Sequence, residues 1–145
     1  MKIPVVRSHP RIPMLATAHL GDAGADLSAS ENHTIEPGQT VLVGTGLSMA
    51  IPPGYAGFVL PRSGLAINHG ITVANAPGLI DSGYRGEIRV GLINHSNSAF
   101  AIEVGDRIAQ LVVMSVETPE FVEVEELDRT DRGVGGFGST GVAGA

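Results

Sequence analysis

The hydrophobic positions of this chain fall into short runs that are rich in β-branched residues and are separated by glycine and proline. Runs of this length, bounded by turn residues, predict β-strands. Pro52-Pro53-Gly54 ends the first long run, and Pro61 ends the next one. One short helix is predicted near residues 63–68. The predicted strands cover residues 40–51, 55–60, 87–94, 99–104, 107–116 and 121–127.

Two of these strands are apolar on both faces. Every residue from Ile108 to Met114 is apolar apart from Gln110, and residues 88–93 are similar. A strand with one face in water should alternate. Both faces are therefore expected to be covered, either by a second sheet or by another subunit. Residues 121–127 do alternate between valine and glutamate, which predicts an edge strand with one wet face.

The composition agrees with an all-β protein. The chain has 145 residues, the size of one ordinary domain, and 43% of them are apolar, which is enough for a core. Aromatic residues make up only 4%, so this core must be mainly aliphatic. The 20 glycines and 9 prolines exclude a helical bundle and favour short strands joined by tight turns, as in a barrel or sandwich.

Several classes of protein are excluded by what the sequence lacks. There is no cysteine, which rules out disulfides and thiolate metal sites. The five histidines lie far apart, and none forms a zinc-binding pair. Residues 1–7 contain no signal-peptide run, and no stretch approaches the length of a membrane span. We therefore expect a cytoplasmic protein with no membrane partner.

The net charge of −6 is distributed unevenly. Residues 117–131 hold seven acidic residues and one arginine, whereas residues 1–116 are nearly neutral. Such an acidic run is typical of a solvated edge strand and linker. There is no basic stripe of the kind that DNA or RNA requires, so no nucleic-acid partner is expected. A small anionic ligand bound by a few arginines is compatible with this distribution.

The glycine-rich end predicts a flexible tail over residues 129–145, following a β-domain over residues 1–128. It lacks the Gly-Lys-[Ser/Thr] ending of a Walker A motif. Two interpretations stay open for this tail. It is either a disordered end, or a segment that orders over a nucleotide, with Arg132 on a phosphate and the Phe137 ring stacked on a base.

Two segments carry residues suited to metal or anion binding. Asp22 and Asp26 flank a glycine and would face the same side of an extended chain, where they could hold a hydrated cation. The simpler interpretation, a turn followed by a strand start, is the one we favour. In Arg62-Ser63-Gly64, a helix start, a hydroxyl and a guanidinium could together hold a phosphate, or form an ordinary capped turn with Ser63 as the cap.

The segment from Asn75 to Glu87 combines three chemistries within a few residues. Asp81-Ser82-Gly83 is a turn signature and on its own predicts a structural role. However, the Asn75 amide could read the edge of a base, and the Asp81 carboxylate could take a proton from water. The Tyr84 ring could pack against a sugar.

The segment Gly105-Asp106-Arg107 before the last long strand predicts a turn with a structural ion pair. Gln110 is a polar residue on an otherwise apolar strand. Because burying an amide without partners is costly, it is expected to contact a ligand or a backbone group.

Taken together and in this order, these segments resemble the five motifs of the trimeric dUTPase family. The resemblance runs from Asp22 to Gly141, about four-fifths of the chain. Its most specific parts are Pro61-Arg62-Ser63-Gly64 and the run from Gly78 to Glu87. It implies a jelly-roll-like β-barrel of the dUTPase (β-clip) type, a homotrimer, and three active sites that are each shared between subunits. It also implies hydrolysis of dUTP to dUMP and pyrophosphate, with Mg²⁺ as cofactor.

The resemblance also implies how the nucleoside would be bound. Asp81 would be the general base that activates the attacking water. Tyr84 would pack under the deoxyribose and exclude a 2′-hydroxyl. Asn75 and the backbone of Leu79, Ile80 and Asp81 would read uracil in a hairpin too narrow for the methyl group of thymine.

By the same resemblance, phosphates would be held by Arg62, Ser63, Gly64 and Gln110, and Asp26 would contact magnesium through water. Arg132 and Phe137 would come from the tail of a neighbouring subunit. Arg89 stands where related bacterial sequences often have lysine near the site, and it is included among the substrate-binding residues without a defined role.

Three alternatives remain at this point, one of them an enzyme that combines the deaminase and pyrophosphatase activities. A dCTP deaminase has a similar fold and would use a glutamate as acid and base, although the Asp81 to Tyr84 hairpin and the Arg132 and Phe137 tail match the hydrolase pattern. A β-trimer that only binds nucleotide or protein partners would tolerate the loss of Asp81, which is present here.

Overall fold

The computed structural model describes residues 1–136, which form eleven strands and one short helix. Its elements are β1 (Val5–Arg7), β2 (Ala25–Ser28), β3 (His33–Ile35), β4 (Thr40–Gly44), β5 (Leu47–Met49), β6 (Tyr55–Leu60), α1 (Ser63–His69), β7 (Ile71–Val73), β8 (Gly78–Ile80), β9 (Arg89–Asn94), β10 (Phe100–Ile102) and β11 (Arg107–Ser115).

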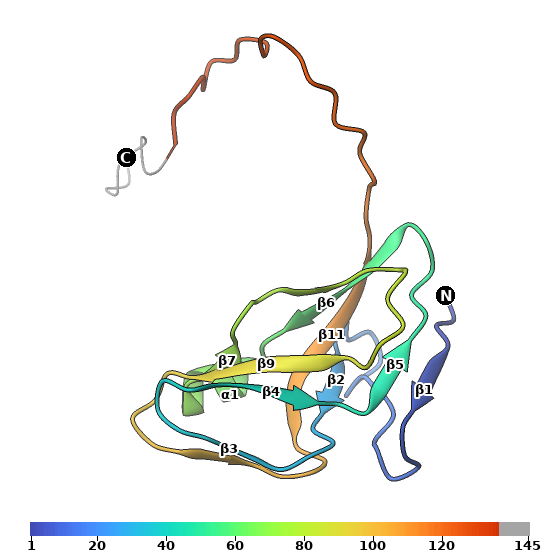
Figure 1. Cartoon of the computed structure of the whole chain (residues 1–145), viewed down its shortest axis with the longest axis vertical. Coiled ribbons are helices and arrows are strands. Elements are labelled where there is room, and N and C mark those ends of the chain that lie inside the picture. The colour runs from blue at the N-terminus through green and yellow to red at the C-terminus, as the bar shows by residue number, and fades with distance from the viewer. Residues whose placement is uncertain (137–145) are drawn as a thin grey trace.

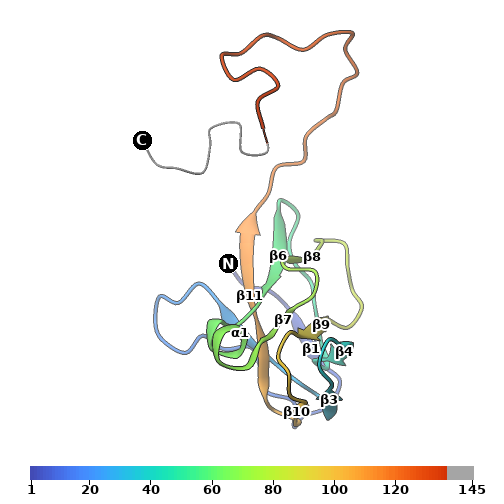
Figure 2. The same cartoon turned by 90° about the vertical axis from the view of Figure 1, so that its left-hand side faces the viewer.

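All strand pairs are antiparallel and belong to four small sheets. The larger two have the strand orders β2-β11-β6-β8 and β4-β9-β7, and the smaller two pair β1 with β5 and β10 with β3. Figures 1 and 2 show these sheets packed into one body, with α1 at its side. The predicted mostly β, jelly-roll-like fold with one helix is confirmed, although the described strands form separate sheets and not one closed ring.

The core lies between the two larger sheets and is aliphatic, as the composition predicts. Leu27 and Leu111 contribute from the four-stranded sheet, and Val43 and Leu92 contribute from the three-stranded one. The inner half of β11 is buried, which explains part of its continuous apolar pattern. Met114, near its outer end, is 52% exposed, so the apolar pattern of that end is not explained by packing within the described chain.

The predicted strand over residues 40–51 is divided by a turn. β4 ends at Gly44 and β5 begins at Leu47. Gly46 has a φ of +65°, a conformation that residues with a side chain rarely adopt. A Cβ there would also collide with Ile12. The glycine therefore turns the chain from one sheet into the next.

The short helix α1 confirms the prediction for residues 63–68, but its start is different. Arg62 and not Ser63 occupies the N-cap position, and no side chain caps the helix. Ser63 is already helical, so the expectation that it caps the helix was wrong. The helix ends at His69 and is capped by Gly70 in a left-handed conformation, whose N–H is bonded to the carbonyl of Ala66.

Residues 116–136 form no strand or helix and leave the end of β11 as an extended segment away from the body (Figures 1 and 2). The predicted edge strand over residues 121–127 was therefore wrong for the described chain. An edge strand needs a neighbour to accept its backbone hydrogen bonds, and Phe121 is instead 91% exposed. The domain boundary at residues 128/129 stays a prediction.

Candidate active site

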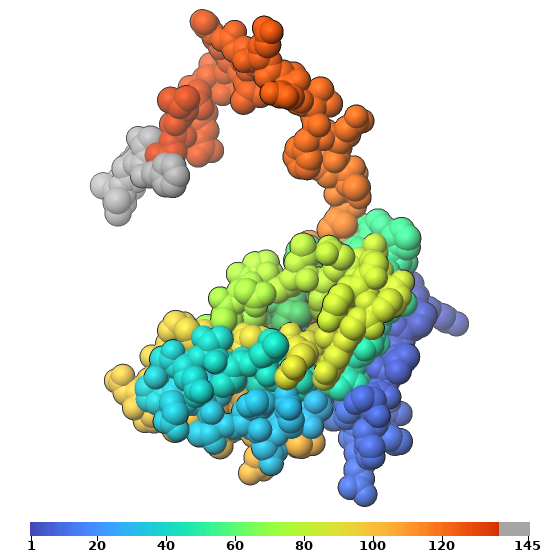
Figure 3. Space-filling view, in the orientation of Figure 1, coloured from blue at the N-terminus to red at the C-terminus, as the bar shows by residue number. Residues whose placement is uncertain are grey.

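One pocket of about 300 Å³ is formed by the chain from β7 to β9 together with parts of β4 and β6. Figure 3 shows it as a hollow in the face of the body between the yellow-green segments. Its floor is aliphatic, and its rim carries the amide, carboxylate and phenol that the sequence analysis singled out. We call it the hairpin pocket; the residues that matter here are Val59, Asn75, Leu79, Ile80, Asp81, Tyr84, Glu87, Ile88 and Arg89.

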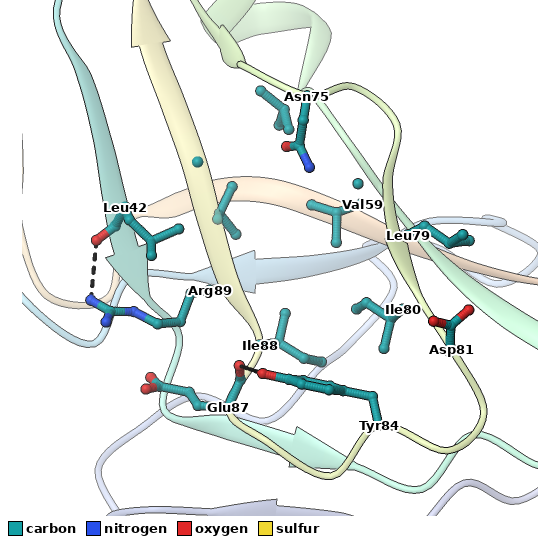
Figure 4. Close-up of a pocket in the computed structure, with 14 residues that line it drawn as sticks. Leu42, Val59, Asn75, Leu79, Ile80, Asp81, Tyr84, Glu87, Ile88 and Arg89 are labelled. Carbon is teal, nitrogen blue, oxygen red and sulfur yellow. Dashed lines mark hydrogen bonds between the residues drawn. The ribbon is translucent and has the colours of Figure 1, made fainter.

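Asp81 and Tyr84 are held on the loop that follows β8. The N–H of Tyr84 donates to the carbonyl of Asp81 at 3.0 Å, which closes the predicted turn. The Tyr84 hydroxyl donates to the main-chain carbonyl of Glu87 at 2.9 Å (Figure 4). The ring lies across Gly86, where a Cβ would collide with it. Both side chains are exposed at the rim and accessible to a ligand.

Asn75 lies on the opposite side of this pocket, with its amide turned inward (Figure 4). Its side chain is close to Gly78 and Gly91: a Cβ would lie 3.6 Å from Asn75 Nδ2 at Gly78 and 3.9 Å from its Oδ1 at Gly91. The two glycines therefore leave room beside the amide. The structure thus brings Asn75, Asp81 and Tyr84 to one pocket, while their chemical roles stay predictions.

Arg89 is directed differently from the other three. Its aliphatic stem lines the pocket, but its Nη2 donates to the carbonyl of Leu42 at 3.2 Å and to Glu31 Oε1 at 3.1 Å (Figure 4). The carboxylate of Glu31 also accepts the N–H of Gly44 at 2.8 Å and lies 3.3 Å from His33 Nε2. The hydrogen bond from Gly44, followed by that from His33, lowers the pKa of Glu31 from its usual value.

A second pocket, of about 550 Å³, is lined by two arginines, Arg62 and Arg107. Backbone pairing aligns Asp26 on β2, Gln110 on β11 and Leu60 on β6 in one row. The pocket extends from this row to the start of α1. We call it the basic pocket; its polar side chains and glycines are Asp22, Gly24, Asp26, Arg62, Ser63, Gly64, Arg107 and Gln110.

Asp26 joins two arginines in the basic pocket. Its Oδ1 lies 3.0 Å from Arg62 Nε, and its Oδ2 lies 3.2 Å from Arg107 Nη1. Arg62 also donates to the carbonyl of Arg107 at 3.0 Å. The interpretation of Asp22 as a turn residue is confirmed, because its carboxylate accepts the N–H of His19 at 2.8 Å. The pairing holds both guanidinium groups beside the pocket.

Arg107 is the residue that the sequence analysis missed here. A turn does form before β11, but over residues 103–106, with the Asp106 carboxylate accepting the N–H of Glu103 at 2.9 Å; Arg107 is already the first residue of the strand. The ion pair of Arg107, however, is made with Asp26. A cation that begins a buried strand was the available signal, but its partner is far away in the sequence.

Gln110 meets a backbone group, as expected for an amide on an apolar strand. Its Nε2 donates to the carbonyl of Pro61 at 3.0 Å. A Cβ at Gly24 would lie 2.5 Å from Gln110 Oε1, so the glycine is needed to make room for this amide. Gln110 therefore ties β11 to the chain entering α1 while it lines the basic pocket.

The two pockets share no lining residue among those described. Val59 lines the hairpin pocket and Leu60 lines the basic pocket, and both belong to β6. Successive side chains of a strand point to opposite faces. The pockets therefore open on opposite faces of the same sheet, and a single described chain does not bring Asp81 and Arg62 together.

Arg132, the tail residue that the structure describes, lies apart from both pockets. Arg132 is exposed, its Nε donates to the carbonyl of Gly135 at 3.0 Å, and it lines neither pocket. Phe137 lies outside the described residues.

Within residues 1–136, no three histidine, aspartate or glutamate side chains form a metal-binding group. In the same part of the chain, no helix has the length and apolar character needed to span a membrane.

An aliphatic pocket with an amide and a carboxylate, together with a second pocket that contains arginines, has the features of a site for a small anionic ligand such as a nucleotide. Comparison with known families narrows this class of ligand. The dUTPase family model matches residues 11–141, which is most of the chain. The chain belongs to the dUTPase family, as its motifs predict.

Relatives support the assignment. The chain is 54% identical over 140 residues to the deoxyuridine 5'-triphosphate nucleotidohydrolase of Nocardia farcinica, covering 96% of this chain and 85% of that protein. It is 52% identical to the protein of the same name from Thermobifida fusca, covering 97% and 79%. A solved structure of Staphylococcus bacteriophage 80alpha dUTPase with dUpNHpp has a TM-score of 0.90 at 29% identity, covering 97% and 99%.

Proposed function

We propose that this protein hydrolyses dUTP to dUMP and pyrophosphate in the cytoplasm, supplying dUMP for thymidylate synthesis and keeping uracil out of DNA. The observation that carries the proposal is the convergence of Asn75, Asp81 and Tyr84 on one narrow pocket, in a chain of the dUTPase family. Selective attack on a deoxynucleotide requires an amide that recognises the base, a carboxylate that takes a proton and a ring that packs against the sugar.

In this proposal the Asp81 carboxylate takes a proton from water as the water oxygen attacks the α-phosphorus. The bond from the α-phosphorus to its bridging oxygen breaks, and pyrophosphate leaves. Tyr84 packs under the deoxyribose, where a 2′-hydroxyl has no room. Asn75 and the backbone of Leu79 to Asp81 bind uracil.

The basic pocket is proposed to hold the phosphates. Arg62 and Gln110 supply N–H donors, and Ser63 and Gly64 supply a hydroxyl and main-chain N–H groups. Both oxygens of Asp26 are already paired with arginines in salt bridges, so this carboxylate is not a free direct ligand. Magnesium commonly keeps its waters and binds through substrate phosphates and one or two carboxylates, so Asp26 fits a contact through water. The ion would neutralise charge that develops on the phosphates.

A homotrimer with shared sites is proposed from the separation of the two pockets. Because Asp81 and Arg62 open on opposite faces of one sheet, both can reach one dUTP only if different subunits supply them. The exposed outer end of β11, including Met114, is apolar surface suited to burial between subunits. The tail of a neighbour would then bring Arg132 to the γ-phosphate and Phe137 to the uracil ring.

Arg89 is given a secondary role in the proposal. Its stem closes one side of the hairpin pocket, and its guanidinium is bound to Glu31 and to the carbonyl of Leu42. Direct contact with the substrate would require it to leave these partners. Loss of Arg89 is therefore expected to affect binding less than loss of Arg62.

Product analysis tests the proposal. The protein is incubated with Mg²⁺ and separately with dUTP, dCTP, UTP and dTTP, and both pyrophosphate and ammonia are measured. Pyrophosphate from dUTP alone supports the proposal, whereas ammonia from dCTP would move it to a deaminase. Repeating the dUTP reaction in ¹⁸O-water should place the label in dUMP. Label in pyrophosphate would refute attack on the α-phosphorus.

A further inference from the structure

Glu87 connects the Tyr84 phenol to the turn between β4 and β5, because its main-chain carbonyl and its side-chain carboxylate each accept a hydrogen bond. Its side-chain Oε1 accepts the N–H of Gly46, in the turn between β4 and β5, at 2.7 Å. Its main-chain carbonyl accepts the hydroxyl of Tyr84 at 2.9 Å. Glu87 therefore links the phenol at the pocket rim to Gly46, which lies 41 positions before Glu87 in the sequence. Figure 4 shows the phenol bonded to the Glu87 carbonyl, with the Glu87 carboxylate directed away from the ring.

The turn that holds the Glu87 carboxylate is itself firmly fixed. Thr45 is fully buried, and its Oγ1 donates to the carbonyl of Ile88 at 2.6 Å. The N–H of Ile88 donates to the carbonyl of Leu47 at 2.8 Å. On the other side, the N–H of Gly44 donates to Glu31 at 2.8 Å. Glu87 is thus attached to a part of the body that has little freedom to move.

Tyr84 has few other restraints. It belongs to the loop between β8 and β9, and 47% of its surface is exposed. Its ring passes over Gly86, which has no side chain to confine it. Its backbone N–H is held by Asp81, but the hydrogen bond of the phenol to Glu87 is what sets the far end of the ring. That carbonyl is held from two sides, by the Ile88 N–H of the same peptide unit, which is bonded to Leu47, and by the carboxylate of its own residue, which is bonded to Gly46.

We propose that Glu87 is a positioning residue that sets the Tyr84 ring at the sugar end of the hairpin pocket. This inference rests on the proposed function, in which Tyr84 discriminates deoxyribose from ribose. A carboxylate that accepts a backbone N–H makes a charge-assisted bond, which is stronger than a neutral one. An amide in its place still offers an oxygen acceptor of the same reach. Alanine offers none, and the aspartate side chain is one methylene shorter.

The test uses fluorine NMR, because the chain has only two tyrosines and no tryptophan. In a Tyr55→Phe background labelled with 3-fluorotyrosine, Tyr84 gives the single ¹⁹F signal. Glu87→Ala and Glu87→Asp should shift this signal toward that of a freely rotating tyrosine, and Glu87→Gln should leave it close to the parent. The matched control is Glu103→Ala, an exposed glutamate that lines neither pocket. Thermal unfolding shows that each variant is folded.

The kinetic readout is the preference for dUTP over UTP, expressed as a ratio of kcat/KM values. It should fall by about tenfold or more in Glu87→Ala and Glu87→Asp, since small displacements of positioning groups have large effects. It should be kept in Glu87→Gln and in the control. An unmoved ¹⁹F signal in both folded Ala and Asp variants overturns the inference. So does a shifted signal with an unchanged preference. A parent that does not hydrolyse dUTP refutes the proposed function, while the NMR result still decides the placement of Tyr84.

Discussion

Val59 and Leu60 are consecutive residues of β6, yet each lines a different pocket. The alternation of side chains across a strand puts the two pockets on opposite faces of one sheet. The residues proposed to act on the nucleoside are thereby separated from those proposed to bind phosphates. In the proposed function, one chain supplies a nucleoside half and a phosphate half of the site, and different copies of the chain bring the two halves together.

Substitution of Asp26 by asparagine tests its proposed contact with magnesium through water. We expect the Mg²⁺ concentration for half-maximal rate to rise about tenfold, as is typical for an outer contact of a metal. The measurement is the dUTP hydrolysis rate across a magnesium titration, with Asp106→Asn as the control because its carboxylate closes a turn outside the pocket. If dUTP binding weakens but the magnesium dependence does not change, Asp26 only positions Arg62 and Arg107.

Truncation after Asp131 tests the proposed role of the tail. The shortened protein lacks Arg132 and Phe137, and its rate should fall by about 10²-fold, the usual effect of removing a donor to developing charge. Its oligomeric state by light scattering should match the parent. Truncation after Gly141 is the control, because the family match ends there. Full activity in the shorter protein would show that the tail takes no part.

Glu31→Gln tests the ionic cluster beside the hairpin pocket. The pKa of Glu31 is lowered in the folded state, chiefly by the hydrogen bond from Gly44, so folding favours the charged form. Its contribution to stability is complete above the usual glutamate pKa of 4.5 and is lost as the pH falls through the lower folded value. The variant should therefore melt below the parent at pH 7, and the difference should shrink below pH 4.5.

The matched control for this experiment is Glu36→Gln, which changes a glutamate whose side chain has no hydrogen-bond partner within residues 1–136. Its melting temperature should follow that of the parent at every pH. A gap between Glu31→Gln and the parent that stays constant from pH 7 to acid would mean that Glu31 does not contribute through its charge.

Asn94→Leu tests the buried polar group of β9. Asn94 is fully buried, and its amide donates to the carbonyls of Ile35 and Ser98 at 2.8 Å and accepts the N–H of Ser96 at 2.8 Å. Leucine would leave these groups unpaired, and we expect a loss of about 3 kcal/mol in the free energy of unfolding. Denaturant titration measures it. The exposed Asn97→Ala should change stability little, and an equal loss there would contradict the assignment.

The fold could be predicted from the sequence where strands are long and aliphatic. β6, β9 and β11 lie within the predicted ranges. Three-residue strands such as β1 and β8 were missed, because their hydrogen bonds come from partners distant in sequence and periodicity needs more residues to be visible. The alternation at residues 121–127 gave a false strand. Alternation indicates that a segment could form a strand with one wet face, but it does not show that a neighbouring strand is present to pair with it.

The candidate site could likewise be predicted only where its residues are close together in the sequence. Asn75, Asp81 and Tyr84 are close in sequence and were predicted to act together, and they share a pocket. The links of Arg107 to Asp26 and of Glu87 to Gly46 join residues 81 and 41 positions apart. Such contacts depend on the register of the sheets, which local pattern does not encode. The separation of the two pockets was visible only once β6 was placed between them.

Subunit complementation tests the shared site most directly. Asp81→Asn and Arg62→Ala chains are co-expressed with different tags, and oligomers containing both are isolated. Because the defects lie in different pockets, about one site in three of a mixed trimer should combine an intact Asp81 with an intact Arg62, and dUTP hydrolysis should reappear. The control pairs Asp81→Asn with Asn75→Ala, both in the hairpin pocket, and should regain nothing beyond its components. If the first pair recovers no more activity than the control, each site is built within one chain and the account is contradicted.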